Sequence, residues 1–162
     1  MARVSRLQRE LQQNRPFRSS AHEAVLALFR TTDVLRRFFA ERLQAYDVTL
    51  QQYNVLRILR GAGADGLPTL AIGERMVEQT PGITRLLDRL ERRGWIVRVR
   101  SERDRRQVIG QLTRAGERLL AAMDDDVDEA DAASLSALSE AQRRQLIRLL
   151  EEVRATHEPR SE

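Results

Sequence analysis

Apolar residues recur at helical spacing along most of this chain, and the pattern changes to strand alternation at only one place. Ile83, Leu86, Leu87 and Leu90 share one helical face, and Gly94 then ends that helix. Residues 95–100 alternate and are rich in β-branched side chains, and residues 107–112 form the return strand after a charged turn. The sequence therefore predicts a mostly α fold that contains one two-stranded β-hairpin.

Helical stripes precede this hairpin. A helix over residues 22–45 is followed by a second helix that begins at Thr49, and a short helix follows Thr69. Thr80 as N-cap and Pro81 as the first helical residue predict the start of the helix before the hairpin. The order is that of a helix-turn-helix pair joined directly to a hairpin.

Two more helices follow the hairpin, and a basic arm precedes the first helix. Thr113 is the predicted N-cap of a long helix, and Ser139 with Gln142 has the spacing of a capping box at the start of a final helix. Residues 1–20 carry apolar residues at helical spacing among arginines, which fits either a short amphipathic arm or a frayed end.

Basic charge is concentrated around the hairpin. The 28 basic residues are all arginine and the net charge is +4; codon bias explains the missing lysine, but arginine still suits phosphate oxygens and guanine edges. Residues 85–114 contain ten arginines against four acidic residues, whereas residues 115–135 contain one arginine against seven acidic residues. This separation indicates that one face of the fold meets a polyanion.

The polar face of the helix before the hairpin is suited to a DNA groove. Burial of the apolar residues turns the others outward, namely Gly82, Thr84, Arg85, Asp88, Arg89 and Arg92. The N-terminal half of such a helix lies closest to base edges in the major groove, which favours Thr84 and Arg85 as contacts. Arg103 and Arg105 at the hairpin tip are placed to reach the DNA backbone or a neighbouring minor groove.

These residues carry a resemblance to the MarR (multiple antibiotic resistance regulator) family. The helix sequence TRLLDRLERRG begins at Thr84, the turn sequence DRR begins at Asp104, and the pattern LT..G begins at Leu112. Each is weak alone, but together at this spacing they are specific. The resemblance is strongest over residues 68–116, and the flanking helices agree in order and length.

The resemblance implies a winged helix-turn-helix homodimer that binds a pseudo-palindromic operator, usually as a repressor released by a small-molecule effector. By position it places Thr84, Arg85 and Arg89 on the DNA-facing part of the recognition helix, and Arg105 and Arg106 on the hairpin, or wing. The DNA-binding residues expected from the helix, the wing and the resemblance together are Thr80, Gly82, Thr84, Arg85, Arg89, Arg103, Arg105 and Arg106.

The chain accordingly divides into four expected parts. Residues 1–20 form an N-terminal arm, and residues 21–48 form a first helix that belongs to the dimerisation region. Residues 49–116 form the winged-helix DNA-binding lobe, and residues 117–162 form dimerisation helices and a tail. The terminal helices have apolar stripes, and a single subunit offers few residues against which these stripes could pack, which favours a homodimer. The alternative is that they fold back on their own subunit.

Asp88 requires a separate explanation, because phosphates repel a carboxylate on a DNA-facing helix. Our hypothesis is a salt bridge from Asp88 to Arg106 that fixes the wing against the helix. The alternatives are a solvent-exposed pair worth less than about 1 kcal/mol, or a solvated helix face with ordinary intrahelical pairs such as Asp88–Arg92.

A possible ligand pocket would lie between the dimerisation helices and the DNA-binding lobe. Four aromatic residues are candidates for its lining, and ordinary core positions are the alternative for each of them: Phe29, Phe38, Tyr46 and Tyr53. Nothing in the sequence identifies the effector.

Several classes of site are excluded. The chain has no cysteine, so disulfides, Cys-based zinc sites and thiol oxidation are absent. Asp124, Asp126 and Asp128 begin a calcium-loop pattern that fails at its glycine and glutamate positions, and His22 and His157 have no neighbouring ligands. Without a phosphate loop or nucleophile elbow we expect no enzyme, metal or cofactor. No apolar run approaches the length of a membrane span and no secretory signal is present, which predicts a cytoplasmic protein.

Two functions remain open from the sequence. One is a ligand-responsive transcription regulator that binds double-stranded DNA. The other is a winged-helix protein-interaction module without operator binding, which would not need Arg85, Arg89, Arg103 and Arg105 together.

Overall fold

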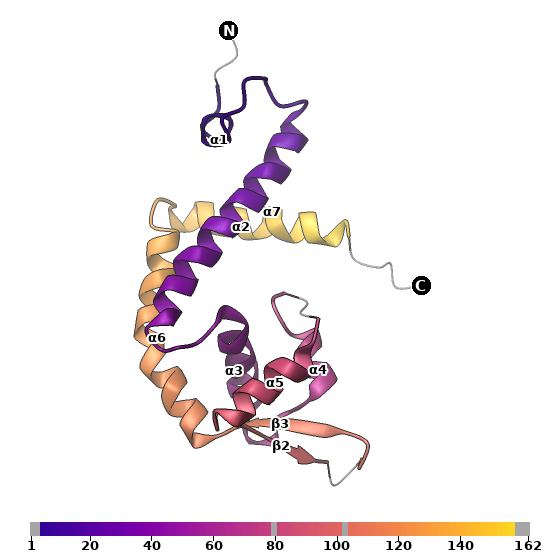
Figure 1. The fold of residues 1–162 in the computed structure, drawn as a ribbon. Coiled ribbons are helices and arrows are strands. Elements are labelled where there is room, and N and C mark those ends of the chain that lie inside the picture. Colours follow the sequence, from indigo (N-terminus) through magenta and orange to yellow (C-terminus); the bar gives the residue numbers. More distant parts are fainter. Residues whose placement is uncertain (1–3, 79–80, 102–103, 158–162) are drawn as a thin grey trace. The chain divides into compact units, whose positions relative to one another are not determined.

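The computed structural model describes residues 4–78, 81–101 and 104–157, and within them the chain is mostly helical with one small sheet (Figure 1). The chain divides into two compact units, residues 1–123 and 124–162, which we describe separately. The elements in chain order are α1 (Arg6–Glu10), α2 (Ser20–Gln44), α3 (Leu50–Ala62), the 3-10 turn η1 (Gly63–Asp65), β1 (Leu67–Pro68), α4 (Thr69–Glu74), α5 (Ile83–Arg92), β2 (Ile96–Arg100), β3 (Val108–Leu112), α6 (Arg114–Ser134) and α7 (Glu140–Ala155). The predicted fold class is confirmed.

Local capping fixes where two of the helices begin. At α3 the Thr49 hydroxyl accepts the N–H of Gln52 at 3.2 Å, and the Gln52 side chain accepts the N–H of Thr49 at 2.9 Å. Ser139 and Gln142 repeat this reciprocal pair at the start of α7, at 3.3 and 2.8 Å. Each box satisfies backbone donors that the first turn of a helix leaves free, so both predicted starts are confirmed.

The sheet has one strand more than the sequence predicted. Its order is β1-β3-β2, with both pairs antiparallel, and the register of the hairpin runs from Ile96↔Leu112 to Arg100↔Val108. β1 pairs Leu67 with Gly110 and is only two residues long, so it carries no alternation that a sequence pattern would reveal. Pro68 has no N–H to donate and is tolerated because β1 is an edge strand.

The predicted start of α5 is wrong. Pro81 lies in a turn, Gly82 is the N-cap with φ 91°, and the helix begins at Ile83. A residue at that φ cannot continue a right-handed helix, and glycine adopts it without the clash that a Cβ causes. Thr80, the expected N-cap, lies outside the described residues.

The core of the first unit is aliphatic. Gly110 of β3 is buried, and a Cβ on it would lie 3.0 Å from Cδ1 of Ile72, so the sheet packs directly onto α4. Fully buried aliphatic side chains come from α2 through α6 and from β2: Leu43, Val55, Leu56, Leu59, Ile72, Leu87, Leu90, Ile96, Leu120 and Met123. This core holds α5 and the hairpin in one lobe.

The second unit contains the C-terminal part of α6 and the whole of α7. None of the residues of α7 is buried, and Ile147, Leu149 and Val153 are about half exposed. Across the residues that the structure describes, no helix combines the length and the apolar character that a bilayer span requires.

Candidate nucleic-acid interface

The outward face of α5 is polar and cationic. Leu86, Leu87 and Leu90 are buried and Ile83 is half-buried, whereas Thr84, Arg85, Arg89 and Arg92 are exposed, and Gly82 before the helix is exposed too. Asp88 is half-buried on the same face. The predicted division of the helix into an inner and an outer face is therefore confirmed, and contact of the outer face with DNA stays a prediction.

Asp104 organises the turn at the tip of the hairpin. Its carboxylate accepts the backbone N–H of Arg106 at 3.0 Å, its own N–H donates to the Ser101 hydroxyl at 3.2 Å, and its carbonyl accepts the N–H of Gln107 at 2.9 Å. These bonds pair backbone groups of the turn with other groups of the same turn. The side chains of Arg105 and Arg106 are exposed. Arg103 lies outside the described residues.

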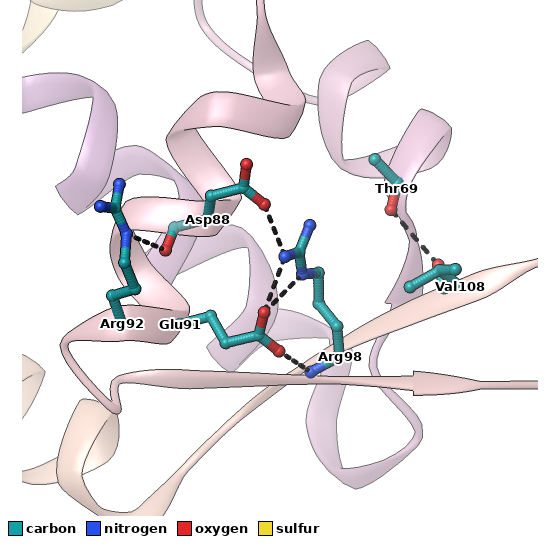
Figure 2. A network of polar contacts seen from close by, with 6 residues as sticks. All are labelled: Thr69, Asp88, Glu91, Arg92, Arg98 and Val108. Atoms are coloured by element: carbon teal, nitrogen blue, oxygen red, sulfur yellow. Dashed lines mark hydrogen bonds and ion pairs between the residues drawn. The ribbon is translucent and has the colours of Figure 1, made fainter.

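Arg98 of β2 joins the hairpin to α5 through two carboxylates (Figure 2). Its Nη2 lies 2.5 Å from Oδ1 of Asp88 and 2.7 Å from Oε2 of Glu91, and its Nε donates to the same Glu91 oxygen at 2.9 Å. The backbone N–H of Arg98 donates to Oε1 of Glu91 at 2.9 Å. The hydrogen bonds from the Arg98 side chain hold the pKa of Glu91 below its usual range, although burial opposes this shift.

The partner of Asp88 is Arg98, and the predicted pairing with Arg106 is wrong. The structure does not bring Asp88 and Arg106 together, since the Asp88 carboxylate binds Arg98 and no ion pair to Arg106 occurs among the described residues. The physical reason is that Arg98 lies on β2, which packs against α5, whereas Arg106 lies in the turn between β2 and β3. The alternative Asp88–Arg92 pair is present only as a 3.2 Å bond from Arg92 Nε to the Asp88 carbonyl.

Arg93 shows that the arginines of this region do not all belong to one surface. Its guanidinium donates to the carbonyl of Asp47 at 3.0 Å and to its carboxylate at 2.6 Å, and lies 4.8 Å from the centre of the Trp95 ring. Asp47 is in the turn between α2 and α3. Arg93 therefore fastens the end of α5 to that turn.

The junction between the hairpin and α6 explains the LT..G pattern. Thr113 caps α6 by accepting the N–H of Gly116 at 3.1 Å, and its hydroxyl lies 2.7 Å from the carbonyl of Gly94. A Cβ on Gly116 would overlap the carbonyl of Trp95 and lie 2.6 Å from Cδ1 of Leu112. Thr113 confirms the predicted cap, and Gly116 is required because backbone approaches backbone.

A groove of about 1010 Å³ lies between α2, α3 and the segment that follows α4. Arg36 of α2 pairs with Glu78 of that segment at 2.6 Å, and the N–H of Val77 donates to the Asn54 side chain at 2.9 Å. The segment before α5 is thus tied to both helices.

The predicted pocket residues are not brought together. Tyr53 lines the groove, but Phe29 is 70% exposed, and the Tyr46 hydroxyl donates to the Ala122 carbonyl at 3.0 Å. Phe38 packs edge-to-face on Phe39. It is Phe39 that lines the groove, because neighbouring residues on α2 point in different directions.

Glu91 and Arg98 are the site residues that the sequence interpretation missed. A signal was present, since Arg98 is two residues from the buried Ile96 and shares its face of β2. An arginine on the inner face of a strand requires a carboxylate partner, and α5 supplies two.

The chain is similar to known DNA-binding regulators. The model of the MarR family matches residues 48–108. The chain is 31% identical to the transcriptional regulator FarR of Neisseria gonorrhoeae, over 68% of this chain and 75% of FarR. It is 27% identical to the homoprotocatechuate degradative operon repressor of Escherichia coli, over 85% of this chain and 91% of the repressor. The structure of the S. aureus MepR–DNA complex superposes with a TM-score of 0.73 at 27% identity, covering 80% of this chain and 96% of MepR.

Proposed function

This chain belongs to the MarR family and is a DNA-binding transcription regulator, and from that premise we propose that it acts as a homodimeric repressor that reads its operator with α5 and the wing. The residues proposed to contact DNA are Thr80, Gly82, Thr84, Arg85, Arg89, Arg103, Arg105 and Arg106. Repression is supported by the likeness to the E. coli operon repressor. Acting on chromosomal DNA, the protein would work in the cytoplasm.

The observation that carries this proposal is the exposed cationic face of α5 together with an exposed cationic turn between β2 and β3. Arg85 and Arg89 are exposed on the helix, and Arg105 and Arg106 are exposed on the wing. The Arg98 network joins α5 to β2, the strand that leads into this turn. A helix for the major groove and a basic loop for the backbone or minor groove is the combination that a winged helix needs.

Exposed apolar residues support the homodimer. Val25, Phe29 and Val34 on α2 are 48%, 70% and 45% exposed, and Ile147 on α7 is 55% exposed. Large apolar side chains that a single subunit leaves exposed on its helices are typical of a subunit interface. A two-fold dimer would set two α5 helices about 34 Å apart, in successive major grooves of a pseudo-palindromic operator.

The groove between α2, α3 and the segment after α4 supports a small-molecule effector. It ends at the segment that leads into α5, and the Arg36–Glu78 ion pair crosses from one wall to the other. A ligand that displaces this pair would change the position of the segment relative to α2. The effector would then act on DNA affinity through the start of α5.

A mobility-shift titration against the DNA upstream of the chain's own gene tests the proposal. If five or six phosphates are contacted, log Kd should change with log salt with a slope of roughly 5, from about 0.9 per phosphate contact. Arg89→Ala should weaken binding, whereas Arg148→Ala on α7, an equally cationic and exposed position, should not; the molar mass of each variant in solution is compared with that of the unmodified chain, because Arg148 neighbours Ile147. Salt-independent binding, or equal losses in both variants, would refute the assignment of α5.

A further inference from the structure

Two carboxylates stand on or beside the face of α5 that is assigned to DNA. Asp88 is between Arg85 and Arg89 in sequence, and Glu91 follows one helical turn later. Duplex DNA carries one negative charge per roughly 1.7 Å of its axis, so two free carboxylates at this position would oppose binding. A cationic partner must therefore neutralise these two carboxylates if the helix is to enter a groove.

The geometry around Arg98 supplies that cancellation. One guanidinium binds both carboxylates, through Nη2 to Asp88 at 2.5 Å and through Nη2 and Nε to Glu91 at 2.7 and 2.9 Å (Figure 2). The Arg98 side chain is only 21% exposed, whereas that of Asp88 is 43% exposed. The cation is therefore turned toward the helix and is poorly placed to reach a phosphate itself.

We propose that Arg98 is a positioning residue for DNA binding that shields Asp88 and Glu91 from the phosphates, and that it does so without contacting DNA. The fork of the guanidinium suits this task because it reaches two carboxylates with separate N–H groups. The same bonds hold β2 against α5, so the shield and the relative placement of helix and wing depend on one side chain. This inference rests on the proposed placement of α5 against DNA.

Arg100 provides a matched control on the same strand. It is two residues from Arg98, so its side chain leaves the same face of the sheet, and it is exposed. In the part of the chain that the structure describes, no carboxylate is paired with it. Substituting Arg98 or Arg100 by glutamine removes the same charge from nearly the same place, but only the first substitution releases two carboxylates.

The test is a thermodynamic cycle on DNA affinity. Asp88→Asn with Glu91→Gln is made in three backgrounds: the unmodified chain, Arg98→Gln and Arg100→Gln. Affinity is measured for the upstream duplex and for a duplex of unrelated sequence, and each variant is checked for native helix content and melting. Arg98→Gln should weaken binding roughly tenfold or more, since it strips the partner from two charges that meet phosphates.

Removing the two carboxylates should restore affinity at least roughly tenfold in the Arg98→Gln background, which corresponds to about 1.4 kcal/mol of coupling. In the unmodified and Arg100→Gln backgrounds the same pair of substitutions should change affinity by less than about threefold. The DNA affinity of Arg98→Lys, which keeps the charge without the forked guanidinium, should lie between that of the unmodified chain and that of Arg98→Gln. This variant replaces Arg98→Gln in the test if the glutamine variant does not fold.

Two results would count against the shield. Equal gains in all three backgrounds would mean that the carboxylates act independently of Arg98. A folded triple variant as weak as Arg98→Gln would mean that Arg98 acts only by holding the strand. If the unmodified chain binds neither duplex, the proposed DNA-binding function fails. That outcome is distinct from normal binding by the unmodified chain with additive effects of the substitutions on affinity, which refutes the shield alone.

Discussion

Gly116 offers a quantitative test of how the wing is joined to α6. Replacement by alanine places a Cβ against the backbone carbonyl of Trp95, and 2.6 Å from Cδ1 of Leu112. The leucine terminus can rotate away, but the carbonyl belongs to the start of the hairpin and accepts the N–H of Thr113 at 3.0 Å. Relief of the overlap therefore requires movement of backbone.

The expected magnitude combines two opposing effects. Overpacking against fixed structure costs up to about 3 kcal/mol, and we take the upper end because the obstacle is a carbonyl. Alanine is better than glycine in a helix by about 1 kcal/mol, which offsets part of that cost. Gly116→Ala should therefore lose about 2 kcal/mol of unfolding free energy, which lowers Tm by roughly 4–8 °C for a chain of this length.

Gly61 is the matched control. It lies in α3, its φ is not positive, and a Cβ there would meet nothing within 4 Å. Gly61→Ala should therefore be neutral or more stable by up to about 1 kcal/mol. Thermal unfolding followed by circular dichroism, at one protein concentration for all variants, compares the two. If the Tm of Gly116→Ala equals or exceeds that of Gly61→Ala, the close approach of Gly116 to the Trp95 carbonyl is refuted.

Three further variants test other contacts of the lobe. Thr113→Val removes the N-cap of α6 and should cost about 1–2 kcal/mol by urea unfolding; no measurable loss would contradict the cap. Arg98 lowers the pKa of Glu91, so the Glu91 carboxylate stabilises the fold above about pH 4.5. Glu91→Gln should therefore be destabilising at pH 7 and progressively less so as the pH falls below about 4.5; a stability difference that does not change with pH would argue against the pair. Asp47→Asn removes the charge from an exposed contact to Arg93 and keeps a side chain that tolerates the φ of 54° at this position, so it should cost less than about 1 kcal/mol; a loss of several would show that the turn depends on the ion pair.

Two helix starts followed from the sequence because their capping boxes depend only on neighbours in the chain. Thr49 with Gln52, and Ser139 with Gln142, stand three residues apart, and each box forms within one turn whatever the rest of the fold does. The buried and exposed faces of α5 followed equally from the helical period of its leucines. These features needed no knowledge of tertiary contacts.

The start of α5 shows where local preference is insufficient. Threonine followed by proline is a favoured helix start, but the chain turns again at Gly82, whose positive φ delays the helix to Ile83. β1 was missed for a related reason. Two residues, one of them proline, form a strand only because β3 is already present beside them.

The sequence by itself determined the order of the main helices and the hairpin, the inward face of α5 and the concentration of arginine around the hairpin, since periodicity and composition are properties of the chain. Only the tertiary structure decided which arginine serves which surface. Arg93 turns to the α2–α3 turn and Arg98 to the carboxylates of α5, while Arg85, Arg89, Arg105 and Arg106 are left exposed. The physical reason is that a guanidinium on a long, flexible stem takes whichever carboxylate the fold brings within reach, and helical or strand spacing does not specify that distance.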